Sequence, residues 1–470
     1  MKKVVKIAGA LLLALLILVF GFGYSNLRDR HRGYGLDLRV ENRHPGMLRA
    51  GFAAVPITPE YMEPWNDLDG NARFEPHKGD SYQDLNGNGK FDTYWIAGFG
   101  NRVAAQGVHD DIWARAMVLD DGTTRLALVA LDLIGMFHPT VIDIRKMIPE
   151  DAGITYLMIA STHTHEAPDM LGLWGESPFK SGVNREWREY VKERVVESVV
   201  EAVNAMRPAH LRFSQNLTEG RVTLKDTREP HVYDDGLRMM QVIDAESSET
   251  LGTMIQWANH PETLWSRNLQ ISSDFPHYLR EAVEKGVYLG DSLVRKGVGG
   301  VALYVNGAVG GLMTTHASME VKDPLRDTVY LEPSFDKIRA QGDTLGLIIL
   351  RTMEENSIEV KEAAINLRAK TFNLPLKNPL FRLAAAIGVM DADMTGWMKK
   401  RTEVAVWSIG PASFITFPGE LYPEILNGGV EALPGRDFPV EALEVPPLRE
   451  LMPGSFRFGI GLVNDEIGYI

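Results

Sequence analysis

Short apolar runs recur along this chain, and segments with a helical pattern lie between several of them. The runs are rich in β-branched and aromatic residues and have the length of buried strands. Residues 186–206 instead place valines at helical spacing along one side. Strands that alternate with helices are typical of an α/β domain. We therefore predict one large α/β domain in which helices flank a mixed β-sheet. The predicted strands are 48–59, 113–119, 126–133, 156–160, 254–258, 301–305 and 404–417.

The N-terminus carries positive charge followed by a long uncharged apolar stretch. Lys2, Lys3 and Lys6 precede or flank residues 7–24, which contain no charged side chain. At ~1.5 Å per residue, this stretch comes close to the ~30 Å hydrocarbon core of a bilayer. We predict that residues 1–24 are a signal peptide or an uncleaved signal anchor, and we favour the anchor. The remaining chain would then be extracytoplasmic (periplasmic or at the cell surface), either membrane-anchored or secreted.

The chain contains no cysteine, which excludes disulfides, thiolate zinc sites and cysteine nucleophiles. An exported protein of this kind depends on a large core, and apolar residues make up 45% of the composition. The formal net charge is −13, and basic residues gather only in the short segment 28–32, so we predict no nucleic-acid binding. Residues 25–47 are charged and mixed and are expected to be a juxtamembrane linker. Residues 48–470 are expected to form the globular domain.

Two histidines separated by one residue follow the predicted strand 156–160. If the chain stays extended, His163 and His165 point the same way from a strand end, where α/β proteins place their chemistry. Such a pair, with further ligands distant in the sequence, suits a catalytic zinc site. A pair of hydrogen-bonded histidines at the end of a strand is the structural alternative. Other metal-capable side chains at the ends of apolar runs are His260, Glu420 and those of the closing segment 464–469.

Over nearly all of its globular part, the chain resembles the neutral/alkaline, non-lysosomal ceramidases. The segment Thr162-His163-Thr-His165-Glu-Ala-Pro168 is similar to that family's Thr-His-Thr-His-Ser-Gly-Pro signature. Further matching motifs occur in the family's order and rough spacing. These are residues 50–58, 114–118 and 130–135, His260-Pro261, Pro418-Gly419-Glu420 and residues 464–469.

The resemblance implies one zinc ion, an acid/base group beside it and an active-site arginine. The implied acid/base group is His165, and the implied arginine is Arg228. The implied activity is hydrolysis of an amide bond, as in N-acylsphingosine or another lipid-like N-acyl substrate, through a zinc-activated water. Arg228 would stabilise the oxyanion, and His165 would protonate the leaving amine. The implied zinc ligands are His163, His260, Glu420 and Tyr469.

The resemblance fails at two places. The family's Gly-Asp-Val-Ser-Pro turn near the metal aligns with residues 307–311, where Gly310 replaces the serine and Ala308 replaces the aspartate. The sequence also ends at Ile470, so the family's C-terminal β-sandwich is expected to be absent, either in a fragment or in a member without it. Two alternatives therefore stay open: a hydrolase of another amide or ester on the same scaffold, and a non-catalytic envelope protein that retains the metal site.

A second metal site is predicted in a polar loop near the N-terminal end of the domain. Asp84, Asn86, Asn88 and Asp92 occupy oxygen-ligand positions of a calcium loop, with Gly89 at its glycine position. Calcium is therefore a second candidate cofactor, with a structural role. An Asn-Gly-rich surface turn is the alternative.

Two other segments carry weaker hypotheses. Ser292, in Gly290-Asp-Ser-Leu293, and the segment Asp274-Phe-Pro-His277 resemble serine-esterase motifs in reversed order, which disfavours a serine hydrolase. Residues 380–398 predict a core helix, with a lipid-accepting mouth as the alternative.

Overall fold

The computed structural model describes residues 2–229, 231–391, 393–396, 398–429 and 446–470. In this part of the chain, the strands form a nine-stranded sheet, a six-stranded sheet and several two-stranded ribbons. The nine-stranded sheet contains β2 (Leu48–Pro56), β6 (Trp113–Asp120), β7 (Arg125–Leu131), β8 (Tyr156–Ser161), β9 (Arg207–Asn216), β11 (Leu237–Asp244), β12 (Thr250–Trp257), β16 (Val301–Asn306) and β20 (Ser357–Val360). The six-stranded sheet contains β1 (Asp37–Val40), β21 (Ile365–Pro375), β22 (Met394–Gly396), β23 (Lys399–Ile409), β24 (Ala412–Thr416) and β25 (Phe456–Ile460).

The helices and the small ribbons complete the described fold. The helices are α1 (Lys2–Leu27), α2 (His138–Met147), α3 (Arg185–Asn204), α4 (Phe275–Glu284), α5 (Phe335–Glu355), α6 (Pro379–Ala386), α7 (Pro423–Asn427) and α8 (Leu448–Leu451). The ribbons pair β3 (Trp65–Asn66) with β4 (Ser81–Tyr82), β5 (Gly107–Val108) with β13 (Gln270–Ile271), β10 (Lys225–Asp226) with β17 (Met313–Thr314), β14 (Gly286–Leu289) with β15 (Ser292–Lys296), and β18 (Val321–Lys322) with β19 (Val329–Tyr330).

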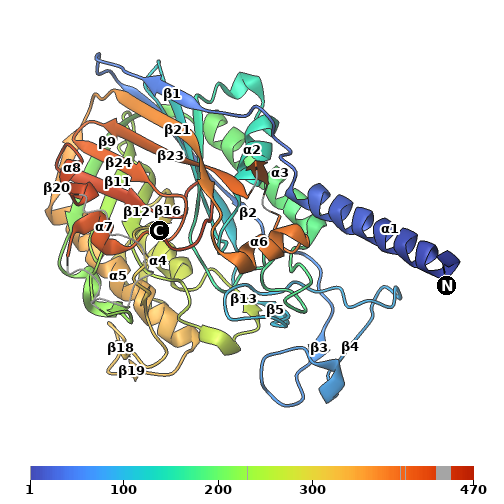
Figure 1. The fold of residues 1–470 in the computed structure, drawn as a ribbon. Helices are drawn as coiled ribbons and strands as arrows, with labels where there is room; N and C mark the ends of the chain where they lie inside the picture. Colours follow the sequence, from blue (N-terminus) through green and yellow to red (C-terminus); the bar gives the residue numbers. More distant parts are fainter. Residues whose placement is uncertain (1, 230, 392, 397, 430–445) are drawn as a thin grey trace.

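The two large sheets pack face to face, and helices cover the outer face of the nine-stranded sheet (Figure 1). The alternation of side chains along each strand produces this layering. On β6, Met117 and Leu119 lie in the core between the sheets, whereas Ala116 and Val118 lie in the core beneath α2 and α3. Helices α4 and α5 cover the β11, β12 and β16 half of the sheet. The predicted α/β fold with helices flanking the sheet is confirmed.

Two details of the prediction differ from the structure. Residues 404–417 belong to two antiparallel strands, β23 and β24, because Gly410 has a φ of 55° and turns the chain ahead of Pro411. Segment 25–47, expected as a linker, contributes β1, which pairs with β21. Both segments belong to the six-stranded sheet, whose strand β24 leads to Glu420.

The strand ends define one edge at which separate parts of the chain meet. Strands β7 and β8, β12 and β16, and β24 and β25 form parallel pairs, whereas the other pairings in these two sheets are antiparallel among the described residues. The loops after β8, β12 and β24 carry His163, His260 and Glu420. In parallel arrangements, the carboxyl ends of strands are the usual place for ligands.

Candidate metal centre

His163 and His260 are oriented in the same way by backbone carbonyl groups. The Nδ1 atom of His163 lies 2.5 Å from the carbonyl oxygen of Ile134, and that of His260 lies 2.8 Å from the carbonyl oxygen of Met313. Both carbonyls accept a hydrogen bond, so each ring holds its proton on Nδ1 and offers Nε2 as a ligand. The two buried rings have centroids 4.9 Å apart. This is the arrangement that metal-binding histidines usually have.

A carboxylate lies opposite both of these ring nitrogens. The Oε2 atom of Glu420 is 3.6 Å from Nε2 of His163 and 3.2 Å from Nε2 of His260. Burial by itself lowers the pKa of His260, but the hydrogen bond and charge of Glu420 outweigh it and raise the pKa to about 9. Burial likewise opposes ionisation of Glu420, yet His163 and His260 hold its pKa well below the usual value. Without a metal, a proton is therefore held between these groups.

His165 lies beside this pair, and its Nε2 is free for a ligand. Its ring centroid is 5.1 Å from that of His163 and 5.7 Å from that of His260. Neither of its buried ring nitrogens has a hydrogen-bond partner within the described residues. Nδ1 lies 3.2 Å from Oε2 of Glu262, at an ion-pair distance. Burial, together with the two neighbouring imidazoles, lowers the pKa of His165 well below its usual value, so the ring is neutral.

Gly98 allows His165 to reach this position. A Cβ atom on Gly98 would lie 2.5 Å from Nδ1 of His165, and the φ of +114° at this residue is one that side chains rarely permit. His163 has a φ of 70°, so the chain leaves the extended conformation after β8. The expectation that an extended His-x-His segment aligns the two rings is therefore wrong. Close packing against the backbone at Gly98 contributes to their proximity.

Asn306 joins three of the strand ends around the histidines. Its amide nitrogen donates to the carbonyl oxygens of Thr162 and Asn259, at 3.0 and 2.9 Å, and its amide oxygen accepts from the Asn259 N–H. The C-terminal segment crosses the same edge, since the N–H of Ser161 donates to the carbonyl of Leu462. These buried hydrogen bonds fix the loops after β8, β12 and β16 relative to one another.

Tyr469 and Arg228 lie at the outer side of Glu420. Tyr469 forms a backbone bridge with Glu420, and its half-exposed ring stacks on Tyr422 at a centroid distance of 6.0 Å. Partial burial and the adjacent Glu420 raise the pKa of the Tyr469 hydroxyl. The guanidinium of Arg228 lies 4.5 Å from the centre of the Tyr422 ring and donates to Glu424 at 2.6 Å. Tyr469 is thus connected to the histidines through Glu420, whereas the side chain of Arg228 contacts Tyr422 and Glu424.

The donor set fits a divalent cation such as zinc. The candidate ligand atoms of His163, His165 and His260 all lie within 4.8 Å of one another. Imidazole nitrogens with one carboxylate are common zinc ligands. The unpaired Nε2 of His165 also indicates that the site is built to meet a further group. The three histidines could therefore hold a metal ion, with Glu420 at its side.

Comparison of the folded chain with solved structures finds ceramidase structures among its matches. The neutral ceramidase from Pseudomonas aeruginosa matches with a TM-score of 0.59 and 15% sequence identity, over 90% of this chain and 68% of that chain. A structure described as ceramidase complexed with C2 matches with a TM-score of 0.61 and 15% identity, over 90% of this chain and 69% of that chain. The chain has a neutral ceramidase-like fold. No protein-family model and no curated protein matches the sequence.

Within this ceramidase-like fold, the position aligned with the family's serine has no room for a side chain. The N–H of Gly310 donates to the carbonyl of Leu421 at 2.8 Å. A Cβ atom on Gly310 would lie 2.5 Å from the carbonyl oxygen of Glu420 and 2.7 Å from the carbonyl carbon of Leu421. These neighbours are backbone atoms and cannot rotate away. The glycine therefore allows the Glu420 loop to approach the loop after β16.

The predicted calcium residues gather in an exposed loop away from the histidines. The side-chain amides of Asn86 and Asn88 each donate to Oδ2 of Asp92 at 2.7 Å. Asp84 accepts hydrogen bonds from backbone N–H groups of the same loop. Buried Glu63 also accepts from the N–H of Asp92. The loop is closed by side-chain to backbone hydrogen bonds, as in Asx turns.

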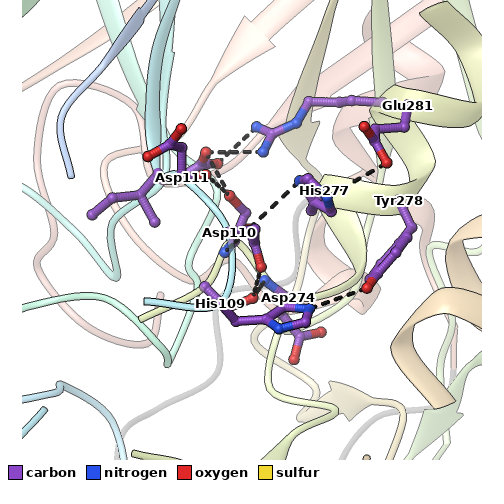
Figure 2. A network of polar contacts seen from close by, with 12 residues as sticks. His109, Asp110, Asp111, Asp274, His277, Tyr278 and Glu281 are labelled. Atoms are coloured by element: carbon purple, nitrogen blue, oxygen red, sulfur yellow. Dashed lines mark hydrogen bonds and ion pairs between the residues drawn. The ribbon is translucent and has the colours of Figure 1, made fainter. Parts of the chain in front are cut away.

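The serine-esterase motif does not form a catalytic arrangement. Ser292 is exposed at the start of β15, and no hydrogen bond joins it to His277 in the described structure. His277 instead lies between Asp110 and Glu281, at 3.6 and 3.5 Å (Figure 2). Asp274 caps α4 by accepting from the N–H of Phe275. Asp274 and His277 therefore stabilise the start of α4 and the loop that joins it to β13.

The network in Figure 2 is connected by hydrogen bonds to the loop after β8, which carries His163 and His165. The hydroxyl of Ser272 donates to Asp110, and the N–H of Ser272 donates to the carbonyl of Glu166 at 3.0 Å. The hydroxyl of Thr164, between the two histidines, donates to the carbonyl of Ser272 at 3.2 Å. The buried contacts of Ser272 with Asp110 and Thr164 therefore support the loop that carries His163 and His165.

Replacing Asp274 with asparagine is expected to remove a pH-dependent loss of stability. Burial raises the pKa of Asp274 to about 7, so the folded protein holds a proton that the unfolded chain releases above about pH 4. Wild-type stability should fall as pH rises from about 4 to 7, by a few kcal/mol at most. Asp274→Asn keeps an accepting oxygen for the helix cap, and its free energy of unfolding should fall less with rising pH than that of the wild type. Urea unfolding of both proteins at pH 5 and pH 8 measures these two changes. An equal change in both proteins would contradict the prediction.

Glu262 is a residue that sequence reasoning passed over. Its carboxylate contacts Nδ1 of His165, so we expect it to hold that ring in one orientation. Glu262→Ala should lower the hydrolytic activity proposed below about 10- to 100-fold with metal content unchanged, the usual effect of losing a histidine's supporting carboxylate. Glu262→Gln should recover part of the activity because its amide oxygen still accepts. Unchanged activity in the alanine variant, measured across pH, would overturn this role.

Proposed function

We propose that this protein is a zinc-dependent hydrolase that cleaves an amide bond in an N-acyl lipid. The observation that carries the proposal is the orientation of His163 and His260. Backbone carbonyls hold Nδ1 of each ring, so both Nε2 atoms face the same oxygen of Glu420. In metalloenzymes, such carbonyl contacts fix the ligating nitrogen. The proposed zinc ligands are His163, His260, Glu420 and, at the rim, Tyr469.

When bound, zinc supplies a Lewis acid and lowers the pKa of a coordinated water to about 7. His165 is neutral and buried, with Glu262 at Nδ1, so its Nε2 can take up a proton and pass it to the leaving amine. The Nε atom of Arg228 is buried and lacks a hydrogen-bond partner in the described part of the chain. It can therefore donate to the polar end of a substrate or to a developing oxyanion.

An aromatic wall beside His165 supports a lipid-like substrate. The Phe99 ring lies 5.3 Å from His165 and 5.2 Å from Trp265, which in turn lies 4.8 Å from His316, measured between ring centroids. Such surfaces bind alkyl chains with few directional demands. We propose that the acyl chain, or the chain of the amine, lies along this wall.

The N-terminal helix supports a location at a membrane outside the cytoplasm. Residues Lys3–Leu27 form an apolar helix that is long enough to cross a membrane and is exposed along its most apolar part. We propose that it is a signal anchor or signal peptide, and that residues 48–470, together with β1 from segment 25–47, form the hydrolase domain. The loop containing Asp84 and Asp92 is proposed as a structural calcium site.

Turnover of a panel of N-acyl amides and matching esters tests the proposed reaction. The full-length protein should hydrolyse a long-chain N-acyl amide, lose this activity with a chelator and regain it with zinc. Turnover of esters alone would support a different hydrolase on the same scaffold. No turnover of any member by zinc-loaded protein would overturn the proposal.

Zinc affinity is expected to increase with pH between pH 6 and 8. In this range His260 is protonated, because Glu420 outweighs the effect of burial and raises its pKa to about 9. A metal must displace that proton, so affinity should rise by up to about tenfold per pH unit. Competition with a zinc-sensitive dye at several pH values measures the slope. An affinity independent of pH would contradict ligation by His260.

A further inference from the structure

Helix α6 carries two exposed leucines next to the end of the apolar helix α1. Leu380 is 71% exposed and Leu383 is 51% exposed. The other side of this segment is core, because Ala385 and Met390 are buried in a cluster that also contains Leu27 of α1. The predicted core helix over 380–398 is thus a short helix, α6, with one buried and one exposed side. Trp397 lies outside the described residues.

The end of α1 is fixed against α6. The side-chain amide of Asn26 donates to the carbonyl of Ala386 at 2.9 Å. Arg30 pairs with Asp393 at 2.5 Å immediately after the apolar helix. Figure 1 shows α6 beside the domain end of α1. A bilayer that contains α1 is therefore brought to α6 by direct contacts, without a free linker.

We propose that Leu380 and Leu383 of α6 insert into the headgroup–acyl boundary of the bilayer that holds α1. The proposal rests on the proposed membrane insertion of α1. A short helix with an apolar face and a buried opposite face suits this boundary, where apolar side chains leave water. Exposed Arg28, Arg32 and Lys377 flank the two helices and can reach lipid phosphates.

This placement would bring the lipid surface close to the histidines. The cluster that contains α6 also includes Ile134 and Ala97. The carbonyl of Ile134 accepts from His163, and Ala97 precedes Gly98, against which His165 packs. One apolar layer therefore separates the proposed membrane surface from the loops that hold the histidines. A lipid leaving the bilayer at α6 would have a short path to the aromatic wall.

Single-cysteine fluorescence tests the contact, since the native chain has no cysteine to remove. An environment-sensitive fluorophore is attached in full-length Leu383→Cys, Leu15→Cys and Leu293→Cys, each in phosphatidylcholine nanodiscs. Leu293, on β15, is a matched control because it is 49% exposed. Leu15 is 57% exposed on α1 and reports insertion of that helix. Quenchers are aqueous iodide and lipids with a nitroxide near the headgroup or near the bilayer centre.

The fluorophore at Leu383 should be quenched by the headgroup-proximal nitroxide and protected several-fold from iodide relative to Leu293. The fluorophore at Leu15 should be quenched best by the nitroxide at the bilayer centre. Iodide quenching at Leu383 equal to that at Leu293, with Leu15 still in lipid, would overturn the α6 contact alone. Protection from iodide without lipid quenching would mean that protein covers α6, which also overturns it. Iodide quenching at both Leu15 and Leu383 would overturn insertion of α1 as well.

Discussion

Replacing His260 with alanine is expected to abolish metal binding at the histidine cluster and to reduce amide hydrolysis by more than ~100-fold. His260 is buried, and its Nε2 is the ring nitrogen closest to Glu420 among the contacts described above. Its removal takes away one proposed ligand and leaves the Glu420 carboxylate with one charge partner fewer. Elemental analysis after zinc reconstitution and turnover of a long-chain N-acyl amide measure the two effects.

His210→Ala is the matched control for this variant. His210 lies on β9, and its Nε2 is 3.7 Å from Glu359 at the sheet edge, so it belongs to none of the proposed machinery. Its loss should leave zinc content and turnover unchanged. Full zinc occupancy with full activity in His260→Ala would remove this residue from the site. Unfolding curves of both variants show whether a loss of binding reflects loss of the fold.

Introducing the family's serine at position 310 is expected to damage the site. In Gly310→Ser, the new Cβ atom would lie 2.5 Å from the Glu420 carbonyl oxygen, so the Glu420 loop or the loop after β16 must move. Overpacking of this kind costs about 1–3 kcal/mol of stability or more when backbone must shift. Because Glu420 is a proposed ligand, zinc affinity should fall together with the urea midpoint.

This result would be specific to position 310 if a glycine in open space tolerates the same change. A Cβ atom on Gly396 meets no atom within 4 Å, and its φ is outside the left-handed region. Gly396→Ser should therefore leave stability, zinc affinity and turnover close to those of the wild type. Higher turnover in Gly310→Ser at unchanged stability would show that the site lacks a hydroxyl it could use.

The layers of the fold could be predicted from the sequence only in part. The recurring apolar runs and the one-sided valines of residues 186–206 predict a mixed sheet flanked by helices, and in the structure helices cover the outer face of the nine-stranded sheet. The second sheet could not be predicted, because it pairs β1, from a charged segment, with β21, more than three hundred residues later. Pairings of this kind depend on the whole chain and leave little local signal.

The candidate site could likewise be predicted from the sequence only in part. The sequence places His163, His260 and Glu420 at the ends of apolar runs, and the structure brings these ends together. The sequence pattern predicts that an extended segment aligns His163 and His165. That reason is wrong, because His163 has a positive φ, which has no clear sequence signature. Glu262 could have been noticed as a carboxylate two residues after a strand-end histidine. Its contact with His165, which lies 97 residues earlier in the sequence, could be seen only in the folded structure.

X-ray absorption at the zinc edge of the purified full-length protein tests whether His163 and His260 bind zinc together. We expect one zinc ion per chain, with at least two imidazole nitrogens at ~2.0–2.1 Å and oxygen ligands at similar distances. The imidazole signal should disappear in a variant that lacks both His163 and His260. A zinc-free wild type after zinc loading, or an unchanged zinc spectrum in that double variant, would contradict it.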